Sequence, residues 1–548
     1  MALLLLAAGT RALAGRAWAA FTAYQTPFAF TNPEATSGPA LADRVVIVLV
    51  DGLTLSASRA MPFLNELRRR GGDADCRAGL PSLSLPGRAV LMTGAWQEVH
   101  GQTTNFNPRR LTVEHLFQAA KKKGLRTAYA AGARARRLFE PYIDEQVPYR
   151  PLPDRHDFED YAARLHRTLE ADRRLLEEKR PELYFLDVSL MDQVGHGWGA
   201  ASAEYARAAR LVDDEIRALA ADIDLSRGVL IVTADHGHVA RGGHGGGEPD
   251  VIAVPLVLAG AAIRAGAHTI AEQVDVAPTV AALLGTEIPA SNQGRVLLEL
   301  LDVPPPARQA IEDRLAAERR NFAASYLAWL ESGPGAGVRD PERAIADARA
   351  ARLGREARGR GLQAAAMVGA VALGFVALVR WRVATPAEVF AAFVCAGAGA
   401  ALYFALLHPM GLRYSFTAVN KDDQLAAFFT KDMALGVGCC ALAAAALAVW
   451  RRRQGEAAPR LDQARLAWLA AAAFAALFVL KIAAVYWRYG VIVRWSIPDL
   501  RWLFGFYLDA LVVMAVGFAS PLLPLAAFLS LGVRARLADA RETGREVS

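Results

Sequence analysis

Continuous apolar runs alternate with amphipathic stretches along roughly the first half of this chain. The run VVIVLV at Val45–Val50 is short and is followed at once by Asp51, as expected of a strand that is buried on both faces. Similar runs recur at Thr127–Ala131, Leu183–Val188, Gly228–Thr233 and Val254–Leu258.

Helical stretches with one apolar face separate these runs. They cover Ala57–Arg70, Val113–Lys123, Phe158–Lys179 and Ser202–Ala221. Strands and helices that alternate at this spacing favour an α/β fold, in which a mostly parallel central sheet carries helices on both faces.

The pattern changes after about Gly361, where long Ala/Leu/Val/Phe runs are separated by arginine clusters. Each run is long enough to cross a hydrocarbon core of about 30 Å, which predicts a C-terminal all-α transmembrane bundle. The five predicted spans lie near Leu362–Val379, Val389–Leu407, Met433–Trp450, Leu466–Trp487 and Phe504–Leu531. Lys481 and Asp509 fall inside apolar spans, and we expect both to lie near enough to span ends to snorkel towards water.

These patterns predict four regions. Residues 1–39 form a weak N-terminal anchor or signal with a linker, because Arg11 and Arg16 interrupt the opening apolar run. Residues 40–302 form a catalytic domain, residues 303–361 a helical connector, and residues 362–548 the membrane domain.

The distribution of Lys and Arg along the chain mainly indicates how the spans are oriented in the membrane. The net charge of the 548 residues is +7, but much of the excess is arginine beside apolar spans, which sets topology and does not indicate nucleic-acid binding. Short loops on the side of the C-terminal tail hold more Lys and Arg than those on the other side. We therefore expect an integral membrane protein with an extracytoplasmic catalytic domain, although the cluster Arg349–Arg360 lies against this trend. Only Cys76 lies in the soluble part, which excludes a disulfide within it.

Carboxylate and imidazole side chains follow several predicted strands, at the sheet edge where α/β proteins place their ligands. Any one of them is explained by a turn or a cap, but six together indicate a metal site. These residues are Asp51, Asp192, His196, Asp235, His236 and His244. Such ligands suit a borderline cation such as Zn²⁺, and six can hold two ions, with other divalent cations as alternatives.

Ser84 lies in PSLSLPGRAV, ahead of a short helical segment that has Pro86 in its first turn. We expect the hydroxyl at or just before the N-cap, where it meets free backbone N–H groups. On its own this is a capping serine; beside a metal centre it is a nucleophile, because serine needs a base or a metal for activation.

From about Val45 to Leu300 the motifs resemble the alkaline phosphatase superfamily, type I phosphodiesterase/nucleotide pyrophosphatase branch, and most of all the catalytic domains of glycosylphosphatidylinositol (GPI) ethanolamine-phosphate transferases. The resemblance implies one zinc on Asp51, Asp235, His236 and the nucleophile Ser84, and a second on Asp192, His196 and His244. It also implies that Asn105, rather than Asn107, contacts a phosphate oxygen.

The resulting hypothesis is a membrane-anchored two-zinc enzyme that acts on a phosphodiester or phospholipid-type substrate through a phosphorylated Ser84, with membrane lipids as partners. The acceptor, water or an alcohol, stays open, as does the oligomeric state. Two alternatives remain. Ser84–Arg88 also matches the Ser-x-Pro-x-Arg signature of sulfatases, whose nucleophile becomes a formylglycine, and the domain could be a non-catalytic membrane scaffold.

Overall fold

The computed structural model describes residues 2–32, 35–148, 157–330, 340–412, 415–418, 422–454, 460–492 and 494–522. The chain divides into two compact units. The helical unit comprises Met1–Ala20, Gly354–Val493 and Arg501–Ser548, and the sheet unit comprises Phe21–Leu353 and Arg494–Leu500.

An eight-stranded sheet forms the centre of the sheet unit, in the order β4-β3-β5-β1-β6-β7-β2-β8. β7 is antiparallel to both of its neighbours, and every other neighbouring pair is parallel. The strands are β1 (Arg44–Val50), β2 (Gly72–Arg77), β3 (Thr127–Ala131), β4 (Glu145–Pro148), β5 (Leu183–Val188), β6 (Gly228–Thr233), β7 (Ala253–Gly260) and β8 (Ala267–Glu272). All five predicted strands are present.

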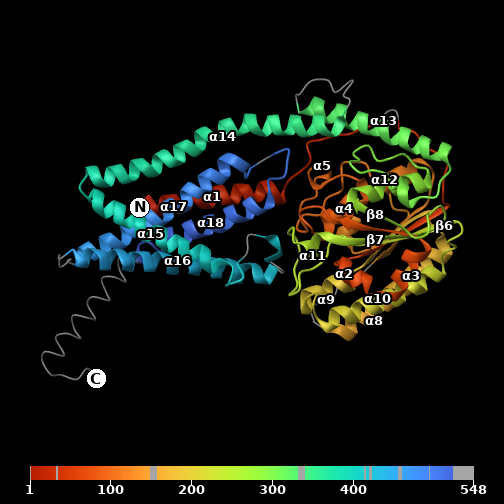
Figure 1. Ribbon diagram of the computed structural model, residues 1–548, viewed down its shortest axis with the longest axis horizontal. Coiled ribbons are helices and arrows are strands. Elements are labelled where there is room, and N and C mark those ends of the chain that lie inside the picture. Colours follow the sequence, from red (N-terminus) through yellow and green to blue (C-terminus); the bar gives the residue numbers. More distant parts are fainter. Residues whose placement is uncertain are drawn as a thin grey trace. The chain divides into compact units, whose positions relative to one another are not determined.

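Helices cover both faces of this sheet (Figure 1). One face carries α3 (Pro62–Arg70), α8 (Phe158–Lys179) and α10 (Ala203–Ala221), and the other carries α4 (Ser84–Thr93) and α12 (Val276–Leu284). The predicted α/β fold class is therefore confirmed. Other α-helices of this unit are α2 (Leu55–Arg59), α5 (Gln97–His100), α6 (Leu116–Lys122), α7 (Ala133–Arg136), α9 (Leu190–Trp198), α11 (Pro249–Ile252) and α13 (Pro305–Trp329).

Two local predictions are wrong. The helix expected over Ala57–Arg70 is two helices, α2 (Leu55–Arg59) and α3, because Pro62 begins a new first turn instead of continuing the old helix. Ser84 is the first helical residue of α4, and Leu83 is the N-cap.

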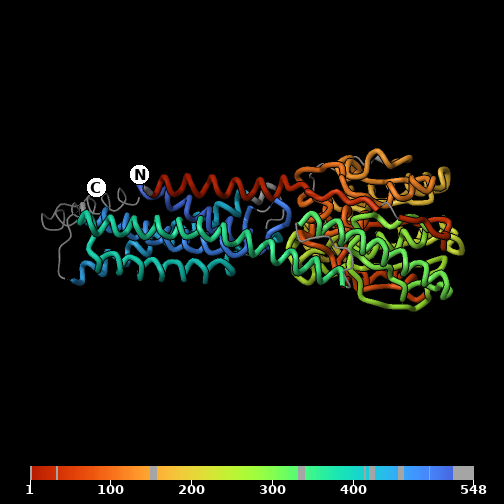
Figure 2. The backbone as a smooth tube through the Cα atoms, turned by 90° about the horizontal axis from the view of Figure 1, so that it is seen from above, coloured from red at the N-terminus to blue at the C-terminus, as the bar shows by residue number. Residues whose placement is uncertain are grey.

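The described residues include five helices that are long and apolar enough to cross a membrane, as predicted. They are α14 (Pro341–Arg380), α15 (Pro386–Leu407), α16 (Asp422–Arg453), α17 (Arg460–Tyr489) and α18 (Leu500–Ala519), and the expected end of the last span at Leu531 lies outside the described residues. Figure 2 shows that α1 (Ala2–Thr22) runs beside the helices of this unit. Its Trp18 ring meets the Tyr507 ring of α18 edge-on, with 5.6 Å between centroids.

Polar side chains lie inside the helical unit. Lys481 Nζ is 2.9 Å from Asp509 Oδ1 and 4.4 Å from the centre of the Phe404 ring, and Asp509 is fully buried. The expectation that Asp509 snorkels is wrong, because its side chain is fully buried and pairs with Lys481 instead of reaching water. For Lys481, whose side chain is 31% exposed, snorkelling stays a prediction.

Candidate metal centre

Asp51, Asp235 and His236 form the first ligand group, at the carboxyl ends of β1 and β6. These strands are parallel neighbours, so the residues that follow them meet at one edge of the sheet. His236 Nε2 lies 3.3 Å from Asp51 Oδ1 and 3.8 Å from Asp235 Oδ2. All three side chains are buried.

Hydrogen bonding determines which ring nitrogen of His236 can bind a metal. Nδ1 lies 3.2 Å from the Gly237 carbonyl, to which only a protonated nitrogen can donate. Burial lowers the pKa of His236 well below its usual range, so the ring is neutral and Nε2 keeps its lone pair. This lone pair faces Asp51 Oδ1, a buried oxygen that accepts no hydrogen bond from the described residues. A cation between His236 Nε2 and Asp51 Oδ1 would stabilise these two electron-donating atoms.

Arg88 of α4 holds the carboxylates of this group from behind. Its Nη2 donates to Asp51 Oδ2 at 2.7 Å and its Nη1 to Asp235 Oδ2 at 2.8 Å. Nε and Nη2 also bind both oxygens of Asp187, the one acidic residue of β5. Burial raises the pKa of Asp51 against the opposing effect of Arg88, and burial together with Asp51 raises the pKa of Asp235 well above its usual range.

Asp192, His196 and His244 form the second ligand group. α9 places Asp192 and His196 one turn apart on the same side of the helix. The Nε2 atoms of His196 and His244 are 3.2 Å apart, and Asp192 Oδ1 lies 3.3 Å from the former and 3.5 Å from the latter. Three ligand-type atoms thus form a nearly equilateral triangle.

His244 is held in the tautomer that a metal needs. Its Nδ1 lies 2.9 Å from the Ser82 carbonyl, so Nδ1 carries the proton and Nε2 is free. Ser82 also fixes the loop through its Oγ, which donates to the Gly246 carbonyl and accepts from Gly245 N–H. Burial lowers the pKa of His244 to about 3, so the ring is neutral near pH 7.

His238 orients Asp192. Its Nδ1 accepts from Gly243 N–H at 3.1 Å, so its proton is on Nε2 and points at Asp192 Oδ1, 3.0 Å away. A protonated nitrogen cannot bind a metal, which makes His238 a supporting residue and not a ligand. Burial would raise the pKa of Asp192, but His196 and the hydrogen bond from His238 outweigh it and hold that pKa well below its usual range.

The two groups approach each other closely because glycine stands at Gly52. Its φ is +77°, and a Cβ there would lie 2.8 Å from the Asp192 Cα and 2.9 Å from the His238 ring. Any other residue would force the chain after β1 away from α9.

Ser84 and Asn105 lie beside the first ligand group. Ser84 Oγ is 3.3 Å from His236 Nε2, and the side chain is half-buried. Asn105 Oδ1 accepts from the N–H of Leu85 at 2.9 Å, which leaves the amide nitrogen as a donor next to Ser84. Asn107 is exposed, and its carbonyl accepts from the Gln102 side chain.

The structure therefore brings all the residues that the sequence singled out to one sheet edge. Sequence reasoning missed Asp187 and Ser82. It singled out Arg88 only as part of the sulfatase signature, and it left substrate contact and a structural role equally open for His238. Two signals were available: Arg88 stands inside an apolar helix, and Asp187 inside an otherwise apolar strand.

Comparison with known proteins finds one family model and several relatives that are similar to this part of the chain. Residues 45–241 match the family model for type I phosphodiesterase/nucleotide pyrophosphatase. The GPI ethanolamine phosphate transferase 1 of Aspergillus fumigatus is 24% identical over 268 residues, which cover 41% of this chain and 26% of that protein. The Neurospora crassa enzyme of the same name is 24% identical over 59% of this chain and 39% of its own length.

A human relative extends this set. The catalytic subunit of human GPI ethanolamine phosphate transferase 2 is 24% identical over 297 residues, which cover 50% of this chain and 29% of that protein. The chain thus spans between about a quarter and two-fifths of the length of these three relatives. Its homologues are enzymes.

Similar solved structures include a 2-O GAG sulfatase, with a TM-score of 0.41 and 16% identity over 48% of this chain and 74% of that one. Murine ectonucleotide pyrophosphatase/phosphodiesterase 5 has a TM-score of 0.37 and 14% identity over 45% of this chain and 96% of that one. Wild-type alkaline phosphatase PafA has a TM-score of 0.40 and 10% identity over 48% of this chain and 100% of that one.

Proposed function

We propose that this chain is a membrane-anchored, two-zinc phosphotransfer enzyme that attacks a phosphodiester with Ser84. The position of Ser84 carries the proposal. Its hydroxyl stands in the first turn of α4 and 3.3 Å from the unprotonated Nε2 of His236. A serine used only as a cap has no reason to face a buried set of carboxylates and imidazoles.

The donor atoms suit zinc. A tetrahedral zinc ion with bonds of about 2.0–2.1 Å keeps its ligand atoms about 3.3–3.4 Å apart, and the second ligand group has separations of 3.2, 3.3 and 3.5 Å. Asp51, Asp235, His236 and Ser84 would hold the first ion, and Asp192, His196 and His244 the second. When bound, the pair of ions supplies Lewis acidity to the phosphoryl oxygens and favours the deprotonated serine.

The first half-reaction is a displacement at phosphorus. A bond forms between Ser84 Oγ and phosphorus, the bond from phosphorus to the leaving alcohol breaks, and the serine proton ends on that alcohol. The Asn105 amide nitrogen donates a hydrogen bond to a phosphoryl oxygen, and it is preset for this because its Oδ1 is already bound to Leu85 N–H. In the second half-reaction the oxygen of water or of a second alcohol forms a bond to phosphorus, the bond from phosphorus to Ser84 Oγ breaks, and the acceptor's proton ends on Ser84 Oγ.

A diester of the phosphoethanolamine type is the proposed substrate, since the curated relatives are named as ethanolamine phosphate transferases. The excess of arginine on the tail side of the spans supports a catalytic domain, residues 40–302, outside the cytoplasm.

Replacement of the nucleophile tests the mechanism. Ser84→Ala is expected to lower turnover of a nitrophenyl phosphodiester by at least about 10³-fold, because the attacking atom is gone. Metal analysis of the same purified chain should still find about two zinc ions, since the other ligands stay in place. Ser226→Ala, in an exposed turn, is the matched control. Full activity of Ser84→Ala would disprove the covalent route.

A second experiment separates transfer from hydrolysis. The membrane-embedded chain is incubated with phosphatidylethanolamine labelled in its head group and, separately, with the nitrophenyl diester. Movement of labelled ethanolamine phosphate to a membrane acceptor identifies a transferase, whereas release of nitrophenol alone identifies a hydrolase. One calcium in place of two zinc ions, with sulfate-ester turnover, would favour the sulfatase alternative instead.

A further inference from the structure

The part of α14 that belongs to the helical unit, from Gly354 to Arg380, carries an exposed apolar stripe. Leu362, Leu373 and Val376 lie on it and are 78%, 69% and 61% exposed. Steps of three and four residues connect these positions, so they share one face of the helix. In a helix long and apolar enough to span a membrane, such a stripe faces the acyl chains of lipids.

Arginines stand at both ends of the apolar stripe. Arg358 lies four residues before Leu362, and Arg355 lies three residues before Arg358, so both continue the same helix face. At the other end, Arg380 lies four residues after Val376. A rise of about 1.5 Å per residue puts Arg358 and Arg380 about 33 Å apart along the helix, close to the thickness of a hydrocarbon core. The stripe thus spans the core, and the arginines lie at the depth of the headgroups.

Aromatic side chains gather at the end of the stripe that carries Arg358. A Cβ at Gly361 would lie 3.2 Å from Nε1 of Trp487, near the end of α17, so α14 and α17 are in contact at this level. Trp487 is 53% exposed, and the rings of Tyr489 and Trp502 stack with 4.6 Å between centroids. Trp and Tyr are enriched where a membrane meets water. These rings therefore indicate the membrane boundary beside Arg358, independently of the helix length.

Two arginines earlier in α14 are engaged inside the sheet unit. Arg349 forms an ion pair with Glu98. The guanidinium carbon of Arg352 lies 4.5 Å from the centre of the Trp329 ring and 4.8 Å from that of the Trp495 ring. Since their own unit holds both side chains, we assign neither of them to headgroups.

Arg355 and Arg358, by contrast, are exposed, and neither has an acidic partner among the described residues. Glu356 stands between them, but its Oε2 lies 3.7 Å from Nη1 of the buried Arg360. Arg488 of α17 is a further exposed arginine, and its guanidinium carbon lies 5.7 Å from the centre of the Tyr489 ring. Positive charge therefore exceeds negative charge at this end of the stripe, and it is accessible.

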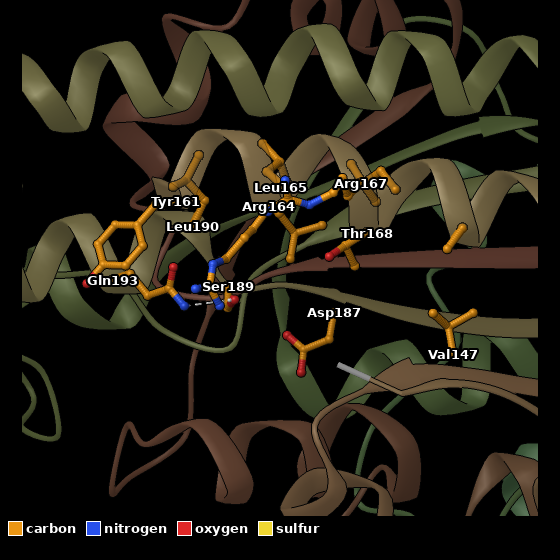
Figure 3. A pocket seen from close by; sticks show the side chains of 13 residues that line it. Val147, Tyr161, Arg164, Leu165, Arg167, Thr168, Asp187, Ser189, Leu190 and Gln193 are labelled. Carbon is orange, nitrogen blue, oxygen red and sulfur yellow. Dashed lines mark hydrogen bonds between the residues drawn. The ribbon is translucent and has the colours of Figure 1, made fainter. Parts of the chain in front are cut away.

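Arg164, beside the cavity in Figure 3, shows the opposite situation. Its Nη2 lies 3.0 Å from Asp160, and the nearby carboxylate of Asp187 is bound by Arg88 at 2.7 and 2.8 Å. The charge of Arg164 is thus compensated inside the protein, whereas the two arginines at the end of the stripe need a partner from outside it.

We propose that Arg355 and Arg358 bind the phosphate of an anionic phospholipid whose acyl chains lie along the apolar stripe of α14. A guanidinium group can pair with two oxygens of one phosphate, and basic residues next to a span attract anionic headgroups. A zwitterionic headgroup carries its own cation and compensates these arginines less well. The site uses neither Ser84 nor the ligand groups, so it does not depend on the proposed function.

Native mass spectrometry of the full-length chain in detergent resolves bound lipids and tests this site. The wild type is expected to bind phosphatidylglycerol more tightly than phosphatidylcholine. Arg355→Gln/Arg358→Gln should weaken phosphatidylglycerol at least about fivefold and leave phosphatidylcholine unchanged. Arg355→Lys/Arg358→Lys keeps both charges and should retain most of the binding. Arg343→Gln is the matched control, since Arg343 is exposed on the same helix but lies 3.9 Å from Asp347, and it should bind as the wild type does.

Equal affinity of the wild type for the two lipids would overturn the proposal, as would normal binding of phosphatidylglycerol by the double Gln variant. An equal loss in Arg343→Gln would overturn the assignment to this end of the stripe. Competition by excess sn-glycerol 3-phosphate would identify a site for a soluble phosphate ester instead of a lipid. Unchanged thermal unfolding of the variants shows that the fold is intact. Because no turnover is measured, failure of this test is distinct from failure of the zinc mechanism.

Discussion

The two ligand groups each hold metal-binding atoms close together, but they do so with different side chains. The first is rich in carboxylates, fully buried, and compensated by the permanent cation of Arg88. The second is rich in imidazoles, and its single carboxylate is oriented by His238, with the Asp192 and His196 side chains 18% and 21% exposed. The first group therefore depends on charge compensation, and the second depends on the correct tautomers.

Replacement of Arg88 should show the largest difference between the two groups, because only the first group depends on its charge. Arg88→Gln leaves Asp51, Asp187 and Asp235 buried without their cation, which is expected to destabilise the metal-free chain by about 3–5 kcal/mol. Added zinc should recover much of this loss, since a divalent cation at the first group replaces the missing charge. Thermal unfolding of the detergent-solubilised chain, with and without zinc, measures both effects.

An exposed arginine gives the control for this change. Arg59 also makes two hydrogen bonds to one carboxylate, Asp75, but it is 56% exposed, and Arg59→Gln should cost no more than about 1 kcal/mol. Equal losses for the two variants would mean that Arg88 does not compensate the first group.

A change at His238 should act on the second group alone. His238→Gln removes the Nε2–H that orients Asp192 and is expected to lower metal affinity at that group about 10- to 100-fold. Zinc titration of the full chain should then show one weakened site and one unchanged site. His268→Gln removes a similar His–Asp contact at the exposed strand β8 and should leave both sites unchanged. A weakening of both sites would show that His238 supports the whole centre.

Burial also explains which strands the sequence could predict. The strands β1, β3, β5, β6 and β7 were predictable because burial on both faces leaves continuous apolar runs. β2 was missed because GDADCR places Asp73 and Asp75 on its more exposed face, so no apolar run marks the strand. β8 is missed for a related reason, since Ile270 is largely exposed there and its apolar residues do not cluster.

The ligands themselves were predictable because Asp and His follow the ends of parallel strands, and strand order places those ends together. The supporting residues were not predictable, since Arg88 binds three carboxylates from three separate strand ends, and Ser82 supports His244 through its backbone carbonyl. A tautomer is decided by such contacts, so the sequence could not distinguish the role of His238 from that of His244.

Acid pH is a natural probe of which group loses its metal first, but the fold has its own acid sensitivity. Burial lowers the pKa of both His100 and His115 to about 3, from an unfolded value of about 6.5. Folded protein therefore binds fewer protons than unfolded protein, so stability is complete above pH 6.5 and is lost as pH falls. Each residue should cost about 1.4 kcal/mol between pH 7.5 and 5.5.

Thermal unfolding of the metal-free chain across this range measures how the free energy of unfolding depends on pH. His100 and His115 contribute equally to this dependence, so His115→Gln should remove about half of their joint contribution. His166 gives a control of opposite sign. The hydrogen bond that its Nδ1–H donates to Glu215 raises the pKa of this exposed ring, so its contribution to stability is present at low pH and is lost as pH rises. If His115→Gln left the slope unchanged, the acid sensitivity would arise in the ligand groups. The second group would be the place to look for it, because the pKa values of Asp192 and His244 are lowered there, whereas the raised pKa values of Asp51 and Asp235 act in the opposite direction.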